Sequence, residues 1–126
     1  MSTISWYEIP TKDIERAQKF YEAILQIKLI PMDVAGFIMR IFPVEDMMQD
    51  VTGALVYNEE FYQSSEHAGS LIYLNANPDV QDVLDRVEAA GGNILVPKTE
   101  ISPEHGYMGI FIDTEGNRIG LHSIPQ

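Results

Sequence analysis

Two stretches of the chain repeat one pattern of apolar and polar positions. Each stretch opens with a short apolar run, at residues 4–9 and 71–75, and leads into a helix that starts at Asp13 or Asp79. In both helices the apolar residues recur at the helical period, which predicts one buried face on each. Three further apolar runs, separated by turn residues, follow each helix. This self-similarity predicts two copies of a strand–helix–three-strand unit, related by a pseudo-twofold axis.

Glycines and prolines delimit the remaining elements of each unit. Gly91 and Gly92 end the second helix, as glycine at a helix C-terminus commonly does. The polar segment 113–117 predicts a hairpin turn in which Gly116 or Asn117 takes the left-handed conformation. The further strands are expected to start at residues 28–30 and to cover residues 37–42, 53–57, 94–96 (ahead of Pro97), 107–112 and 118–122.

These patterns predict an α+β protein that forms a single domain over residues 1–126. Its first module covers about residues 1–60 and its second about residues 68–126. The segment between them, residues 58–69, is polar and shows no apolar period, which is typical of a linker. A chain of 126 residues suits one domain or two fused half-units that share little core.

Charge and composition narrow the classes of partner. The chain has 19 acidic and 8 basic residues and a net charge of −11, a field that repels nucleic acids and anionic membranes and favours a neutral or cationic ligand. It has no cysteine, which excludes disulfides, a thiol nucleophile and thiolate metal sites. No apolar run is long enough to span a bilayer, and the N-terminus does not resemble a signal peptide, so a cytoplasmic location is expected.

Three motifs carry a resemblance to a known family. They are Asp-Ile-Glu-Arg-Ala at residues 13–17 ahead of Phe20 and Tyr21, Val-Glu-Ala-Ala-Gly-Gly at 87–92, and Asp-Thr-Glu-Gly-Asn-Arg-Ile at 113–119. In order and spacing they resemble the vicinal oxygen chelate superfamily, which includes glyoxalase I, extradiol dioxygenases, and fosfomycin- and bleomycin-resistance proteins. The resemblance implies paired βαβββ modules whose curved mixed sheets surround a cleft. It also implies a homodimer, and exposed sheet edges beside a limited core favour the same assembly.

The resemblance also defines four positions at which metal-using relatives place ligands, early in the first strand and late in the last strand of each module. Divalent ions need several nitrogen or oxygen donors at close range. The residues at these positions have no donor side chain, so we expect neither a metal nor another cofactor. They are Trp6, Leu71 or Ile72, Gly53 or Leu55, and Gly120.

Glu8 is the strongest candidate for a chemical role. It interrupts an apolar strand and shares a face with Trp6, and a buried carboxylate is costly without a partner. In the cleft it would act as a general base, with Tyr73 or His122 as the proton donor. The alternative is a carboxylate at a strand end that contacts water or a neighbouring tyrosine. His122 would hydrogen-bond Glu8 if their strands approach each other across the cleft.

The predicted ligand-binding residues are aromatic and flexible apolar side chains. Trp6, the only tryptophan, either stacks on a planar ligand or fills the sheet interior. Phe37 and Tyr107 are candidate aromatic walls of the cleft, and Met39 supplies adaptable apolar surface, although each would also suit an ordinary core position.

These observations favour a glyoxalase-like protein that binds a small organic molecule without a metal, and whose catalytic form would be an acid–base isomerase or lyase. One alternative is a non-catalytic sequestering protein that resembles the bleomycin-resistance members. Another is a metal-dependent lyase or dioxygenase with shifted ligands, for which Glu8 and His122 are the candidates.

Overall fold

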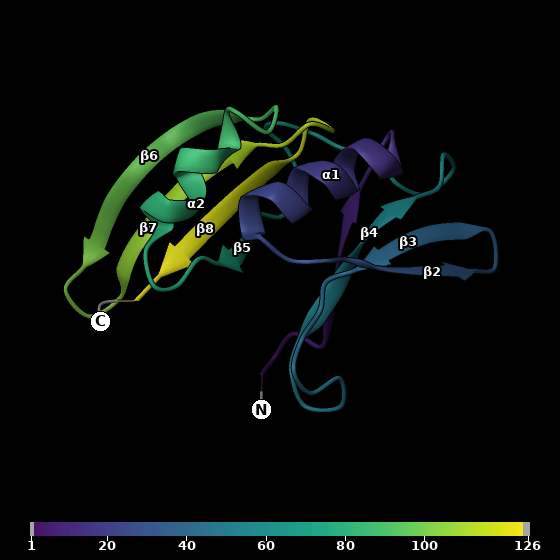
Figure 1. Cartoon of the computed structure of the whole chain (residues 1–126), viewed down its shortest axis with the longest axis horizontal. Helices are drawn as coiled ribbons and strands as arrows, with labels where there is room; N and C mark the ends of the chain where they lie inside the picture. Colours follow the sequence, from purple (N-terminus) through teal and green to yellow (C-terminus); the bar gives the residue numbers. More distant parts are fainter. Residues whose placement is uncertain (1, 125–126) are drawn as a thin grey trace.

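The computed structural model describes residues 2–124, which form two helices and two four-stranded mixed sheets (Figure 1). Module one contains β1 (Trp6–Pro10), α1 (Ile14–Leu25), β2 (Ile30–Val34), β3 (Phe37–Ile41) and β4 (Thr52–Tyr57). Module two contains β5 (Ile72–Asn75), α2 (Val80–Val87), β6 (Asn93–Ser102), β7 (Gly106–Ile112) and β8 (Arg118–Ser123).

The two sheets have the same topology. Sheet A has the strand order β1-β4-β3-β2, and sheet B has the order β5-β8-β7-β6. In each sheet the first and last strands of the module pair in parallel, and the other neighbours are antiparallel. This correspondence confirms the predicted pair of βαβββ modules.

Equivalent aspartates begin the two helices. The Asp13 side chain accepts a hydrogen bond from the Arg16 backbone N–H at 3.1 Å, and Asp79 accepts one from Gln81 at 2.9 Å. Each bond satisfies a backbone donor that has no partner within its helix. Gly91 has a φ of 110°, in the left-handed region, and follows α2 as predicted. Neither helix of the described chain is long and apolar enough to cross a membrane.

Two prolines lie inside strands, although Pro97 was expected to follow its strand. Pro31 is the second residue of β2, and Pro97 lies in the middle of β6, which continues to Ser102. Both strands are at the edge of a sheet, where one side of the backbone has no partner strand. A proline, which has no N–H, is tolerated in such a strand because its nitrogen can face the unpaired side. The prediction that strand 94–96 stops ahead of Pro97 is therefore wrong. The register of β6 against β7 shifts at three points, so β6 is irregular as well as long.

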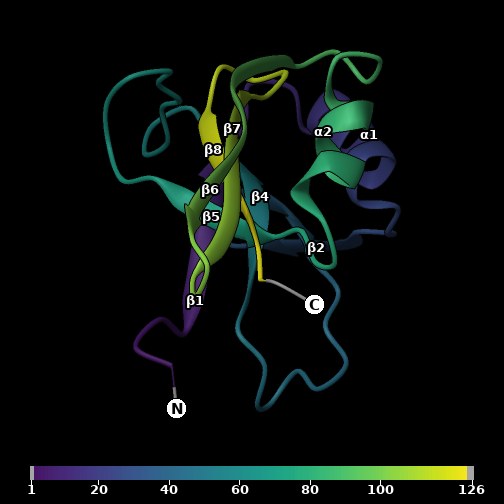
Figure 2. The same ribbon diagram turned by 90° about the vertical axis from the view of Figure 1, so that its left-hand side faces the viewer.

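One hydrophobic core joins the modules. Phe20 and Tyr21 of α1 pack against Phe111 of β7, with ring centroids 5.7 and 6.3 Å away. In Figure 2 the two helices lie next to each other on one side of the molecule, and the linker runs along the opposite side. The two modules thus share a core instead of folding as separate half-units. Each sheet keeps one face that no helix covers.

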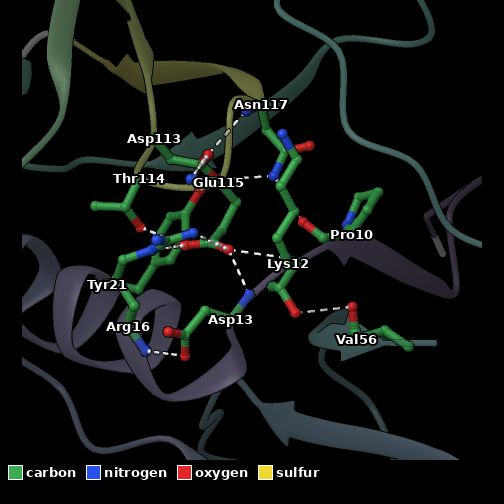
Figure 3. Close-up of polar contacts among 11 residues, drawn as sticks. Pro10, Lys12, Asp13, Arg16, Tyr21, Val56, Asp113, Thr114, Glu115 and Asn117 are labelled. Atoms are coloured by element: carbon green, nitrogen blue, oxygen red, sulfur yellow. Dashed lines mark hydrogen bonds and ion pairs between the residues drawn. The ribbon is translucent and has the colours of Figure 1, made fainter. Parts of the chain in front are cut away.

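A polar network also ties the modules together (Figure 3). Glu115, in the turn between β7 and β8, is buried and bonds to the start of α1 in the other module. Its carboxylate accepts hydrogen bonds from the backbone N–H groups of Lys12 and Asp13, both at 2.8 Å, and from Arg16 Nε at 2.7 Å. The turn therefore acts as an anchor for the N-terminus of α1.

Asp113 forms the other half of this network. It accepts a hydrogen bond from the Tyr21 hydroxyl at 2.6 Å and from the backbone N–H groups of Glu115 and Asn117 at 2.9 and 2.8 Å. Burial raises the pKa of Asp113, against the opposing effect of these hydrogen bonds. Gly116 has a φ of 84°, which confirms a left-handed residue in the predicted turn.

Candidate functional site

The open face of sheet A, which we define as the face away from α1, carries most of the residues predicted to bind a ligand. Side chains alternate along a strand, so Trp6 and Glu8 point to this face while Ile9 is in the core. A small apolar cluster surrounds them. Its members are Phe37, Met39, Ile41, Ala54, Val56 and Tyr62.

Glu8 is held in place at both carboxylate oxygens. Trp6 Nε1 donates a hydrogen bond to Oε2 at 3.1 Å, and the Tyr62 hydroxyl donates a short one to Oε1. The hydrogen bond to Glu8, with a smaller contribution from burial, raises the pKa of Tyr62 to about 12. Tyr62 therefore keeps its proton at neutral pH and remains a donor to Glu8. The result is a carboxylate of fixed orientation beside a half-exposed indole ring.

Sequence reasoning missed Tyr62, because it lies in the segment interpreted as a polar linker. Its ring packs edge-on against Phe37, with centroids 5.9 Å apart, and the neighbouring Phe61 ring lies 6.1 Å from Phe37. The adjacent aromatics Phe61 and Tyr62 in an otherwise polar segment were the one available signal. The contacts of both rings with Phe37 show that the linker folds back over the open face of sheet A.

Tyr73 and His122 lie on the open face of sheet B, which is the face away from α2. The Tyr73 ring lies against Gly120, its partner on the neighbouring strand, and 48% of the residue is exposed. His122 Nε2 is 2.6 Å from the backbone oxygen of His105. His122 was expected to hydrogen-bond Glu8 if their strands approached each other, and this condition is not met, because β1 and β8 belong to different sheets that do not pair.

Within residues 2–124 no strand of sheet A pairs with a strand of sheet B, and no strand backbone of one sheet runs beside a strand of the other. Glu8 with Trp6 and Tyr73 with His122 therefore form two separate groups in one chain. Glu8 and Tyr73 occupy equivalent positions in the two sheets. Glu8 of β1 pairs with Ala54 of β4, and Tyr73 of β5 pairs with Gly120 of β8.

Tyr107 does not belong to the open face. It shares the opposite face of β7 with Phe111, which is fully buried, and it packs against the main core. Lys98 Nζ lies 4.5 Å from the centre of its ring, a cation–π contact. Tyr107 was predicted as a wall of the cleft, and the alternation of β7 overturns that prediction.

The residues at the family's ligand positions do not fit a metal ion. The pairing of strands places Ala54, rather than Gly53 or Leu55, on the open face late in module one, and Gly120 is its equivalent. Neither has a donor side chain. Glu8 would supply a single carboxylate, which is too few donors to hold a divalent ion. No group of three or more acidic or histidine side chains suited to a metal occurs in the described part of the chain.

Comparisons with known proteins agree with this fold. Residues 3–121 match the family model of the Glyoxalase/Bleomycin resistance protein/Dioxygenase superfamily. No curated protein matches the chain. Among solved structures, glyoxalase I from Zea mays is 25% identical with a TM-score of 0.70, over 94% of this chain and 44% of the maize chain. The chain thus spans less than half of the maize protein's length.

Two further structures match over most of both chains. The trypanothione-dependent glyoxalase I of Leishmania major is 22% identical, with a TM-score of 0.68, over 98% of this chain and 87% of that one. A glyoxalase/bleomycin resistance protein from Albidiferax ferrireducens is 20% identical, with a TM-score of 0.68, over 95% and 98%. On the match over residues 3–121, the chain belongs to the glyoxalase/bleomycin resistance protein/dioxygenase superfamily.

Proposed function

We propose that this protein binds a small organic molecule on the open face of sheet A, and that Glu8 is the polar anchor of the site. The observation that carries the proposal is the carboxylate of Glu8, fixed by Trp6 and Tyr62 among apolar side chains. A ligand pocket typically combines apolar walls with a few oriented polar groups. A carboxylate next to an indole ring suits a ligand that carries a cationic or N–H group on an apolar body.

We expect aromatic ligands to bind in the order of their charge. Benzylamine should quench the fluorescence of Trp6 and bind more tightly than benzyl alcohol, and benzoate should bind least. Glu8→Gln should weaken benzylamine binding about tenfold and leave benzyl alcohol unchanged, because only the ammonium group uses the carboxylate charge. Glu15→Gln, at an exposed acid on α1, is the matched control. Equal affinities for the three probes would contradict the proposal.

The proposed assembly is a homodimer that covers the open faces. Apolar side chains on the open face of sheet A are exposed in β2, among them Met32 and Val34, and Tyr73 is half exposed on sheet B. Exposed apolar surface of this kind marks interaction sites in soluble proteins. A second copy whose sheet B lies opposite Glu8 would bring Tyr73 and His122 to the site. The acid–base isomerase or lyase version of the proposal depends on that arrangement.

Light scattering should accordingly give twice the 14.2 kDa mass of the chain. Met32→Lys should shift the protein toward monomer, because it places a charge in the covered face. Met48→Lys is the control, since Met48 is 89% exposed in the loop between β3 and β4. A monomeric wild type, or equal effects of the two lysines, would count against the dimer.

We also expect the purified protein to retain far less than about one divalent ion per chain after incubation with Ni²⁺, Zn²⁺ or Mn²⁺ and dialysis. The reason is that Trp6, Ala54, Leu71 and Gly120 provide no side-chain donors. Elemental analysis measures the result. Retention of about one ion per chain that is lost in Glu8→Gln or His122→Ala would instead favour a metal-dependent lyase or dioxygenase with shifted ligands.

Turnover distinguishes the remaining alternatives. Stoichiometric binding without turnover would favour a sequestering protein that resembles the bleomycin-resistance members. The fixed carboxylate and the aromatic surface support binding in either case.

A further inference from the structure

A cavity lies next to Glu8, where the inner edges of the two modules come together under the linker. Its volume is about 230 Å³. Glu8 and Pro10 of β1 line one side, Ile72 of β5 and Arg118 of β8 line the other, and Gln63 and Ser65 of the linker contribute to its cover. Pockets for drug-sized ligands are usually larger, about 300–1,000 Å³. The size of this cavity therefore suits a compact molecule.

Arg118 lines this cavity and has one donor without a hydrogen-bond partner within residues 2–124. Its Nε is buried and has no hydrogen-bond partner in the described chain. Only one of its terminal nitrogens, Nη2, reaches an acceptor, the Gly69 backbone oxygen, at a long 3.5 Å. A buried N–H of a guanidinium without an acceptor is costly, since its hydration is lost without replacement. Within the described residues the terminal nitrogens of Arg118 make only this one long hydrogen bond, so a carboxylate from outside the chain would find free donors on them.

Glu8 is the acidic residue that lines the same cavity. It forms no ion pair with Arg118. Two residues of opposite charge thus line one small cavity without forming an ion pair with each other. A molecule that carries both charges at short separation complements this arrangement. Its anionic end would satisfy Arg118, and its cationic end would use the lone pairs that Trp6 and Tyr62 leave free on Glu8.

We propose that this cavity binds a small α-amino acid or a closely related zwitterion, with its carboxylate at Arg118 and its ammonium group at Glu8. The proposal rests on the proposed function, because both use Glu8, and it narrows the class of ligand. The apolar side chain Ile72 would contact the body of the molecule. The walls favour small amino acids over large aromatic ones.

The test is an NMR titration of the full chain with L-alanine, L-alanine methyl ester and N-acetyl-L-alanine. The ester lacks the carboxylate charge and the acetylated form lacks the ammonium charge. L-alanine should shift the amide signals of residues 63–70 and 118 and should bind about tenfold more tightly than either derivative. L-tryptophan should bind more weakly than L-alanine because of the cavity's size.

Variants then assign the two ends of the ligand. Arg118→Gln should weaken L-alanine about tenfold and abolish its advantage over the methyl ester, whereas Lys19→Gln, at an exposed lysine of α1, should change neither. Glu8→Gln should abolish the advantage over the acetylated form. If Arg118→Gln does not fold, Arg118→Lys, which keeps the charge and removes the Nε donor, should show a smaller loss of affinity.

The outcomes separate this inference from the proposed function. Benzylamine binding that depends on Glu8, together with no L-alanine binding, would overturn the zwitterion site alone. Failure of both probes to bind would overturn both proposals. An unchanged L-alanine affinity in the Arg118 variants, or a methyl ester that binds as tightly as the free acid, would assign Arg118 to holding the linker through its contacts with Ser65 and Gly69.

Discussion

Replacing Glu115 with alanine is expected to lower the free energy of unfolding by about 3 kcal/mol, because it removes the acceptor that joins the two modules. The Glu115 side chain is fully buried, while its partner Arg16 is half exposed, so water compensates only the arginine. The backbone N–H groups of Lys12 and Asp13 would lose their acceptor as well. Urea unfolding of Glu115→Ala and of the control Glu15→Ala measures the difference.

The same carboxylate should make stability depend on pH. Burial by itself would raise the pKa of Glu115, but hydrogen bonds from Arg16, Asp13 and Lys12 outweigh it and lower the pKa to about 2. A group whose pKa is lowered in the folded state contributes stability that is present above its unfolded pKa of 4.5. That contribution is lost as the pH falls from about 5 toward 2. Glu115→Gln, which cannot ionise, should lack this part of the pH dependence.

Comparing wild type with Glu115→Gln separates the effect of Glu115 on stability from that of Asp113. The raised pKa of Asp113 changes stability with pH in the opposite direction, and Asp113 is present in both proteins. Parallel stability curves for wild type and Glu115→Gln across this pH range would contradict the role of Glu115. So would equal losses of stability for Glu115→Ala and Glu15→Ala at neutral pH.

Gly53→Ala is expected to destabilise the fold by about 3 kcal/mol, at the upper end of the range for overpacked cores. A Cβ on Gly53 would collide with the backbone carbonyl oxygen of Tyr7 and would lie 2.6 Å from two of its ring carbons. The carbonyl belongs to β1, which pairs in parallel with β4 at this point. The backbone therefore has to move, and the Tyr7 ring, which packs 5.8 Å from Phe42, has to move with it.

Gly120→Ala is the matched control on the equivalent strand of module two. The three atoms nearest to a Cβ on Gly120 would all belong to the Tyr73 ring, the first of them at 2.5 Å. Tyr73 is half exposed, so its ring can rotate toward solvent at a cost below about 1 kcal/mol. Thermal or urea unfolding of the two variants should thus give clearly different losses. Similar losses would show that side-chain rearrangement, rather than the backbone collision, decides the cost.

Local sequence patterns determined the elements and their repetition. The alignment of Asp13 with Asp79 predicts two helices with equivalent caps, and the structure has both. The alternation of strand residues predicts that Trp6 and Glu8 share one face of their strand. These features depend on neighbours within a few residues, so the periods of 3.6 and 2 are enough to reveal them.

Tertiary structure alone decided which of these side chains meet. Tyr62 reaches Glu8 across 54 residues of sequence because the linker folds back over sheet A, and no local pattern encodes that path. Strand order placed Pro31 and Pro97 on sheet edges, where a strand tolerates proline. Burial of Phe111 turned Tyr107 toward the core. The shared cavity of Glu8 and Arg118 likewise depends on how the module edges come together, and so on contacts that only the folded chain makes.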